Sequence, residues 1–107
     1  MAYKEERIST LLKNLAANFL ERESSRTSLI TVTGISISKD FKKADILISV
    51  LPERDEDTAL AFAKRKRSDL RDFIKKQTRM RVLPFFDFKI DRGERNRQRI
   101  DELSNNS

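Results

Sequence analysis

The chain of 107 residues contains no cysteine and no histidine. Without cysteine it forms no disulfide and has no reactive thiol, a composition typical of the cytoplasm, where we expect the protein to reside. Without histidine it lacks the commonest general base and the commonest metal ligand. The only glycines are Gly34 and Gly93, so there is no glycine-rich phosphate loop. We therefore expect no enzyme activity, no cofactor and no metal site.

The sequence also lacks a membrane-spanning segment and a calcium-binding loop. No apolar run approaches the length of a membrane span. The densest acidic segment, residues 53–57, lacks the glycine and the alternating ligands of a calcium loop. We interpret this segment as a solvated loop and the start of a helix. What remains is a small chain with a highly charged surface, 37% apolar and 37% charged, and room for one hydrophobic core.

The excess positive charge is concentrated in one segment. Residues 64–81 contain nine cations and two anions, a net of +7, whereas the rest of the chain has a net of −1. Like charges this close repel one another, and such segments commonly bind a polyanion. The candidate binding residues are Lys64, Arg65, Lys66, Arg67, Arg71, Lys75, Lys76, Arg79 and Arg81.

The segment from residue 4 to residue 22 has the apolar spacing of an amphipathic helix. Its apolar side chains recur at intervals of three and four residues, which places them on one helical face. They are Ile8, Leu11, Leu12, Leu15, Ala16, Phe19 and Leu20.

Residues 28–52 predict a β-hairpin with an irregular first strand. Apolar residues alternate on both sides of Gly34, but with opposite parity. One extra residue there, a β-bulge, would return all of them to the core face, and glycine tolerates the unusual backbone that such a site can require. The residues concerned are Ile30, Val32, Ile35 and Ile37 in the first strand and Ala44, Ile46, Ile48 and Val50 in the second, which Pro52 ends.

Residues 82–90 predict a third strand, with Val82, Pro84, Phe86, Phe88 and Ile90 on one face. The proline removes one ladder donor, which suits an edge strand or the start of a strand. Phe85 falls on the opposite face. We expect it to be partly buried under the C-terminal segment, and stacking on a nucleic-acid base is the less favoured alternative.

The first strand is the only one without a charged residue, since the others contain Asp45, Asp87 and Lys89. We therefore expect the first strand at the centre of a three-stranded mixed sheet. A right-handed helical crossover over one face would make the third strand parallel to it. With the first helix on the same face, the fold class is a two-layer α+β domain.

The crossover between residues 57 and 81 contains a helix that cannot be straight. One turn beyond Ala63, a straight helix would direct Lys66 or Arg67 into the core, and burying an unpaired cation costs several kcal/mol. Ser68 is a good N-cap residue, followed by acidic residues that suit the start of a new helix. We predict a break at Ser68, with residues 64–67 directed into solvent at the kink.

A helix–kink–helix between a β-hairpin and a third strand is the topology of K-homology (KH) domains, in the type II variant with extra N-terminal elements. The chain resembles the ribosome-binding factor A family, which lacks the GxxG loop of other KH domains and bends its helix at Ala-x-Gly. The resemblance rests on VTGISISKDFKKADILISVLP (32–52), MRVLPFFDF (80–88) and RIDEL (99–103). It departs at the kink, where Lys66-Arg67-Ser68 replaces Ala-x-Gly.

We expect a KH-like domain over residues 1–92 and a charged tail over 93–107, in which residues 95–103 can form a short helix. The resemblance implies a ribosome assembly factor, and we expect a monomer with no membrane or small-molecule partner. Such a factor binds the free small (30S) subunit late in maturation, aids 16S rRNA processing and matters most in the cold. Small-subunit ribosomal proteins are additional candidate partners. The nine cations would contact rRNA phosphates rather than base edges.

Two other functional classes stay open. The chain could be a general KH-like nucleic-acid adaptor without a ribosomal role, or a protein-interaction domain whose basic face meets an acidic protein. The simplest alternative for residues 64–81 is a solvated helix face without a partner. A membrane-surface helix is less favoured, because the apolar side is needed for the core and no tryptophan is present to anchor it.

Overall fold

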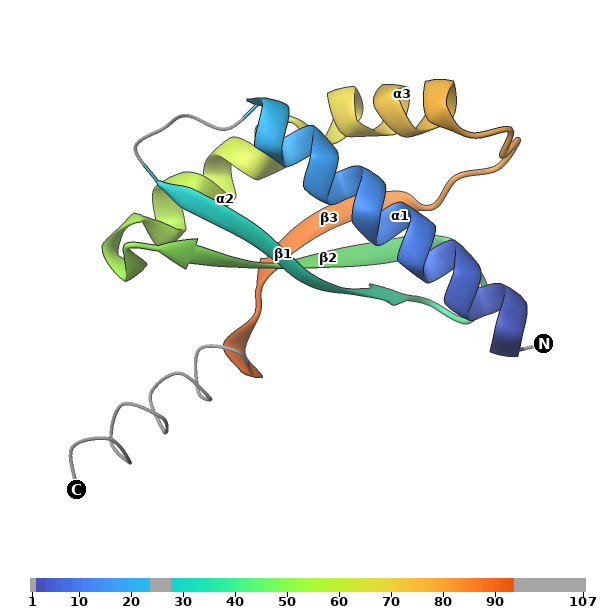
Figure 1. Ribbon diagram of the computed structural model, residues 1–107, viewed down its shortest axis with the longest axis horizontal. Helices are drawn as coiled ribbons and strands as arrows, with labels where there is room; N and C mark the ends of the chain where they lie inside the picture. Colours follow the sequence, from blue (N-terminus) through green and yellow to red (C-terminus); the bar gives the residue numbers. More distant parts are fainter. Residues whose placement is uncertain (1, 24–27, 94–107) are drawn as a thin grey trace.

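The structure, a computed structural model, describes residues 2–23 and 28–93 of the chain, with residues 2–6 as backbone only. Figure 1 shows the helix α1 crossing the β-sheet diagonally, with α2 and α3 following one another on the same side of the sheet. The predicted two-layer α+β arrangement is confirmed. The elements are α1 (Ala2–Glu23), β1 (Leu29–Ile37), β2 (Lys43–Leu51), a 3₁₀ turn η1 (Glu53–Asp55), α2 (Glu56–Arg65), α3 (Arg67–Gln77) and β3 (Phe85–Ile90).

The strand order is β1-β2-β3, so β2 and not β1 is central. β2 runs antiparallel to β1 and parallel to β3. The prediction of a central first strand, with the third strand parallel to it, is wrong. It assumed that a charged residue marks an edge strand, but Asp45 of β2 lies on the sheet face away from the helices, where Lys89 pairs with it at 3.1 Å. A strand with one open face can hold a charge at the centre of a sheet.

The predicted bulge in β1 is confirmed, and Thr33 is its extra residue. Val32 pairs with Ile48 and Gly34 pairs with Leu47, so one residue of β1 has no partner in β2. The expectation of an unusual glycine backbone is wrong, because Gly34 has no positive φ. A Cβ atom there would lie 3.6 Å from Leu47 Cδ1, an ordinary contact. The four apolar residues of β1 all pack against the core, as predicted.

The Thr33 side chain links the bulge to the end of β3. Its hydroxyl donates a hydrogen bond to Asp91 Oδ2 at 2.6 Å, across 58 residues of sequence. The Asp91 backbone amide donates to Ile48 O at 2.8 Å. The bulge therefore holds the residue that follows β3 against the central strand.

The core lies between the sheet and the helices. Alternate residues of β2 are buried, as the period of a half-buried strand requires. The predicted stripe of α1 faces them, except that Leu11 is 43% exposed. The buried side chains of these two elements are Leu12, Ala16, Phe19 and Leu20 in α1 and Ala44, Ile46, Ile48 and Val50 in β2.

The third strand is shorter than predicted. β3 begins at Phe85, and Val82 is 72% exposed rather than on the core face. Leu83 is buried instead, because the segment before β3 is not extended in register with it. Pro84 is buried directly before the strand and β3 is an edge strand, as the proline predicted.

The acidic segment 53–57 forms η1 and the first turn of α2, as expected. None of the described helices is long and apolar enough to cross a membrane. The predicted helix over 95–103 lies outside the described residues, and so does the tail apart from Gly93.

Candidate nucleic-acid interface

The kink between α2 and α3 is centred on Lys66, which has φ −95° and ψ 7°. Its backbone amide donates to Ala63 O at 3.0 Å, and its carbonyl accepts from the Leu70 amide at 2.9 Å. This bridge conformation turns the chain while nearly preserving the helical ladder. The prediction of a break and cap at Ser68 is wrong. Ser68 is the second residue of α3, and no side chain caps the start of that helix.

The kink changes the direction in which α2 and α3 present their apolar residues. Ala59 and Ala63 of α2 are buried, and so are Leu70 and Ile74 of α3. Because the bend separates these pairs, both helices turn apolar residues inward. The cations between them stay at the surface.

Arg67 is fixed by three contacts to the protein. Its Nε donates to Lys64 O at 3.0 Å, at the end of α2. Its Nη1 lies 3.2 Å from Asp87 Oδ1 in β3. The guanidinium also lies 5.3 Å from the centroid of the Phe85 ring. Arg67 therefore ties the kink to the edge of the sheet.

Two of its neighbours are also paired. Lys64 Nζ lies 3.6 Å from Asp87 Oδ1. Lys66 Nζ lies 3.7 Å from Glu23 at the end of α1 and 3.9 Å from Asp69. The prediction that all four kink cations extend freely into solvent is therefore wrong for three of them. Their carboxylate partners Glu23 and Asp87 lie far away in sequence, so periodicity could not reveal them.

Asp87 is the electrostatic centre of this contact. Burial by itself would raise the pKa of Asp87, but four influences outweigh it. They are the hydrogen bond from the Phe88 amide, the positive charges of Lys64 and Arg67, and the hydrogen bond from the Arg67 side chain. Together they hold the pKa below the ordinary aspartate value. The carboxylate thus stays ionised between the two cations at neutral pH.

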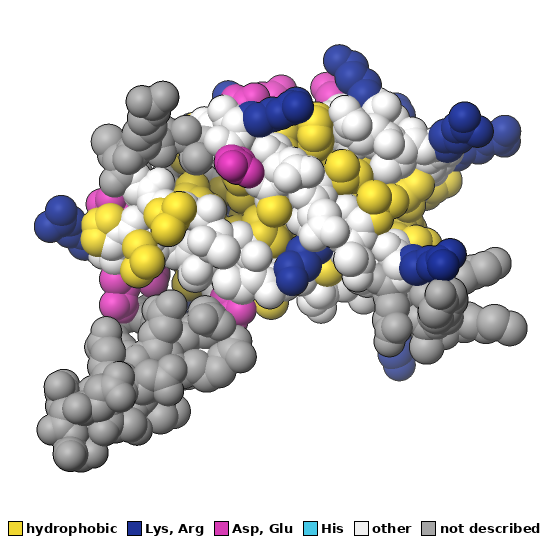
Figure 2. Space-filling view, viewed as in Figure 1, with side chains coloured by type: hydrophobic (Ala, Val, Ile, Leu, Met, Phe, Trp, Pro, Cys, Tyr) yellow, Lys and Arg dark blue, Asp and Glu magenta, His cyan; other side chains and the backbone are white. Residues whose placement is uncertain are grey.

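The remaining predicted cations form an exposed set along α3 and the segment after it. Figure 2 shows dark-blue side chains projecting at the end of the molecule where α3 lies. Unlike the half-buried Lys64, Lys66 and Arg67, these side chains are available to a partner. The exposed set consists of Arg65, Arg71, Lys75, Lys76, Arg79 and Arg81.

The C-terminal turn of α1 packs against α3 beside this surface. The rings of Phe19 and Phe73 lie 5.7 Å apart, and the Arg22 guanidinium lies 5.6 Å from the Phe73 centroid. Arg22 was not among the predicted binding residues, because it lies more than 40 positions before the cationic segment. It adds a cation to the edge of the same surface.

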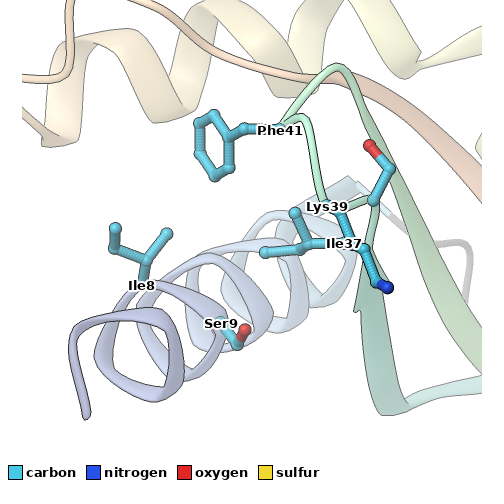
Figure 3. Close-up of a pocket in the computed structure, with 6 residues that line it drawn as sticks. Ile8, Ser9, Ile37, Lys39 and Phe41 are labelled. Carbon is cyan, nitrogen blue, oxygen red and sulfur yellow. The ribbon is translucent and has the colours of Figure 1, made fainter. Parts of the chain in front are cut away.

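A recess of about 560 Å³ lies elsewhere, between α1 and the β1–β2 turn. In Figure 3, Phe41 and Ile37 point from the hairpin toward α1, where Ile8 lies. Phe41 has φ 61°, a strained value for an aromatic residue, and its ring packs against the core. The recess contains none of the nine predicted cations. Within the described part of the chain, no group of three acidic residues could hold a metal ion.

These features define a KH-like domain without a GxxG loop, whose helix–kink–helix carries a cationic surface. The sequence matches the family described as ribosome-binding factor A over residues 4–104. The chain belongs to the ribosome-binding factor A family.

Relatives support this assignment over nearly the whole chain. The ribosome-binding factor A of Thermodesulfovibrio yellowstonii is 31% identical over 97% of this chain and 93% of its own length. That of Coxiella burnetii is 29% identical over 96% of this chain and 88% of its own.

Solved structures support the fold. The crystal structure of ribosome-binding factor A from Thermus thermophilus matches with a TM-score of 0.72 and 24% identity, over 79% of this chain and 92% of that one. A homology model of the Thermus protein, fitted into a cryo-EM map of its complex with the 30S subunit, matches with a TM-score of 0.69 and 26% identity. That match covers 78% of this chain and 91% of the other.

Proposed function

We propose that this chain binds the free 30S ribosomal subunit through its helix–kink–helix surface and assists late maturation of 16S rRNA. The observation that carries the proposal is the exposed set of six cations on α3 and its flanks in a member of this family. A related protein from Thermus thermophilus has been fitted into a map of its 30S complex, which supports the small subunit as the partner.

The proposed mechanism is binding without catalysis. Cations on one face displace counterions from rRNA phosphates, so the affinity depends steeply on salt. A factor that binds one arrangement of the rRNA more tightly than another shifts the population toward the first. The fixed kink suits this role, because Arg67 and Lys64 hold the two helices on the sheet through Asp87.

Sedimentation through sucrose gradients tests the proposal. The tagged protein should sediment with free 30S subunits and not with translating 70S ribosomes. Sedimentation at the top of the gradient with retained affinity for naked RNA would instead indicate a general nucleic-acid adaptor. Retained binding to an acidic protein alone would indicate a protein-interaction domain.

Matched charge variants locate the surface. The double variant Lys75→Gln with Lys76→Gln removes two exposed cations from α3, and Lys39→Gln with Arg54→Gln removes two exposed cations outside the helix–kink–helix. Only the first should weaken 30S association and flatten its salt dependence. Equal effects of the two pairs would show that overall charge, rather than this surface, determines binding.

A further inference from the structure

Phe85 is an exposed aromatic residue between two buried neighbours, Pro84 and Phe86. Its side chain lies at the start of β3 and is 52% exposed, whereas Leu83, Pro84, Phe86 and Phe88 are all buried. The alternation of the strand directs Phe85 away from the core. An aromatic ring left in water forgoes the gain of burial, and it offers a flat apolar surface to a partner.

The side chain of Arg67 lies against the Phe85 ring. The Arg67 guanidinium lies 5.3 Å from the ring centroid and is itself fixed on Asp87 and on Lys64 O. A cation at this distance is attracted by the π face of the ring. Arg67 thus restrains the ring and leaves more than half of the side chain accessible.

The surroundings of the ring favour an anionic ligand. Arg71 Nη1 donates to Pro84 O at 3.4 Å, directly beside Phe85, and the exposed Lys43 is the register partner of Phe85 in β2. The two carboxylates of the neighbouring sheet face are already paired, Asp87 with Lys64 and Arg67 and Asp45 with Lys89. Cations able to reach phosphates therefore flank a flat apolar surface.

We propose that Phe85 is a stacking platform for an unpaired base of single-stranded RNA. In this arrangement the base packs on the exposed ring, Arg67 supports the ring, and Arg71 and Lys43 contact the phosphates on either side. The proposal rests on the RNA-binding function proposed above and deepens it. A cationic helix surface binds the phosphates of any RNA, whereas an exposed ring is useful only where a base is out of its duplex.

The first test compares two forms of RNA. The protein is titrated with an unstructured single strand of about 10 nucleotides and with a duplex of the same length, at several salt concentrations. Phe85→Leu should weaken single-strand binding roughly tenfold and leave duplex binding unchanged. The slope of affinity against salt should also stay the same, because no phosphate contact is lost. Val82→Leu, at an exposed apolar residue three positions earlier, is the matched control.

A second test reports the contact directly. The chain contains no tryptophan, so Phe85→Trp introduces a single indole. Its fluorescence should be quenched by the single strand and not by the duplex, whereas Val82→Trp should respond to neither. This variant keeps an aromatic ring at the site, so it decides the matter even if Phe85→Leu fails to fold.

The outcomes separate the two proposals. If the wild-type chain binds neither RNA, the proposed function fails and the stacking site fails with it. If the wild-type chain binds both RNAs with a salt dependence, but Phe85→Leu binds normally and Phe85→Trp is not quenched, only the stacking site is overturned. If Phe85→Leu loses 30S association and keeps its single-strand affinity, the ring contacts a ribosomal protein and the stacking site is likewise overturned.

Discussion

Arg67 and Asp87 join the kink to the edge strand across 20 residues of sequence, with Nη1 and Oδ1 3.2 Å apart. Their side chains are 37% and 20% exposed, so the pair is neither a free surface contact nor a buried one. Because the same guanidinium closes the end of α2 through Lys64 O, this contact links the backbone at the kink to the sheet.

Arg67→Gln should therefore destabilise the fold, whereas Arg65→Gln should not. We expect the first to lower the free energy of unfolding by about 1 kcal/mol, allowing for solvent screening of a half-exposed pair. The second removes an exposed cation and should change stability by less than about 0.5 kcal/mol. Urea unfolding of both variants measures the difference, and equal stabilities would mean that Arg67 contributes charge and no support.

Asp87 should make stability depend on acidic pH. Its folded pKa lies below the unfolded value of about 3.9, so its contribution is complete above that value and is lost as pH falls through the folded pKa. Asp87→Asn should lose stability at about pH 6 and show a smaller further loss between about pH 6 and pH 3 than the wild type. Denaturant unfolding at the two pH values checks this. Parallel losses in the two proteins would place the acid sensitivity elsewhere.

Ser68→Ala should change stability by no more than about 0.5 kcal/mol. As an N-cap, Ser68 would contribute about 1 kcal/mol to stability. Instead, the N-cap position is Lys66 and Ser68 lies within the first turn of α3. Alanine has the higher helix propensity at such a position. Thermal unfolding compares the stabilities of the wild type and the variant. A loss of about 1 kcal/mol would indicate that Ser68 is the N-cap of α3.

The bulge should depend on Thr33 more than on Gly34. Thr33→Val removes the hydroxyl that donates to Asp91 and should cost about 1 kcal/mol. Gly34→Ala adds a methyl group at ordinary contact distance and without positive φ, and should be neutral or stabilising by up to about 1 kcal/mol. Chemical denaturation of both variants measures the two stability changes. A larger loss for Gly34→Ala than for Thr33→Val would mean that the glycine backbone is essential.

The affinity for RNA should depend on salt concentration less steeply than the nine cations of residues 64–81 would imply. Asp87 and Glu23 lie outside the segment and pair with its cations, lowering the local net charge from +7 to +5. Each phosphate contact contributes a slope of about 0.7–0.9 in a plot of log affinity against log salt. A total slope of the size expected for all nine cations would show that RNA displaces the internal ion pairs.

The fold was largely predictable because its elements are strongly periodic. The stripe of α1, the alternation of β2 and the parity change in β1 each follow from burial of one face. The strand order was not predictable from charge. Asp45 and Lys89 pair on the open face of the sheet, so neither charge is buried in the core. Which strand lies at the centre depends on contacts between segments that no local pattern records.

The candidate site was predictable in position and not in arrangement. The density of cations and the impossibility of a straight helix located the kink to within two residues. Its exact residue depends on Arg67, whose contacts with Asp87 and Phe85 form only when β3 is in place. For the same reason, the division of the cations into paired and exposed groups could not be read from the sequence.

The contacts of Arg67 also affect the entropy of binding. A free arginine side chain samples many rotamers and loses up to about 2 kcal/mol of that freedom when a ligand immobilises it. Arg67 is already restrained by a carbonyl, a carboxylate and a ring, and this loss occurs when the protein folds. In the proposed stacking arrangement, a strand of RNA would meet a cation and an aromatic ring that are already oriented, and less conformational freedom would be lost on association.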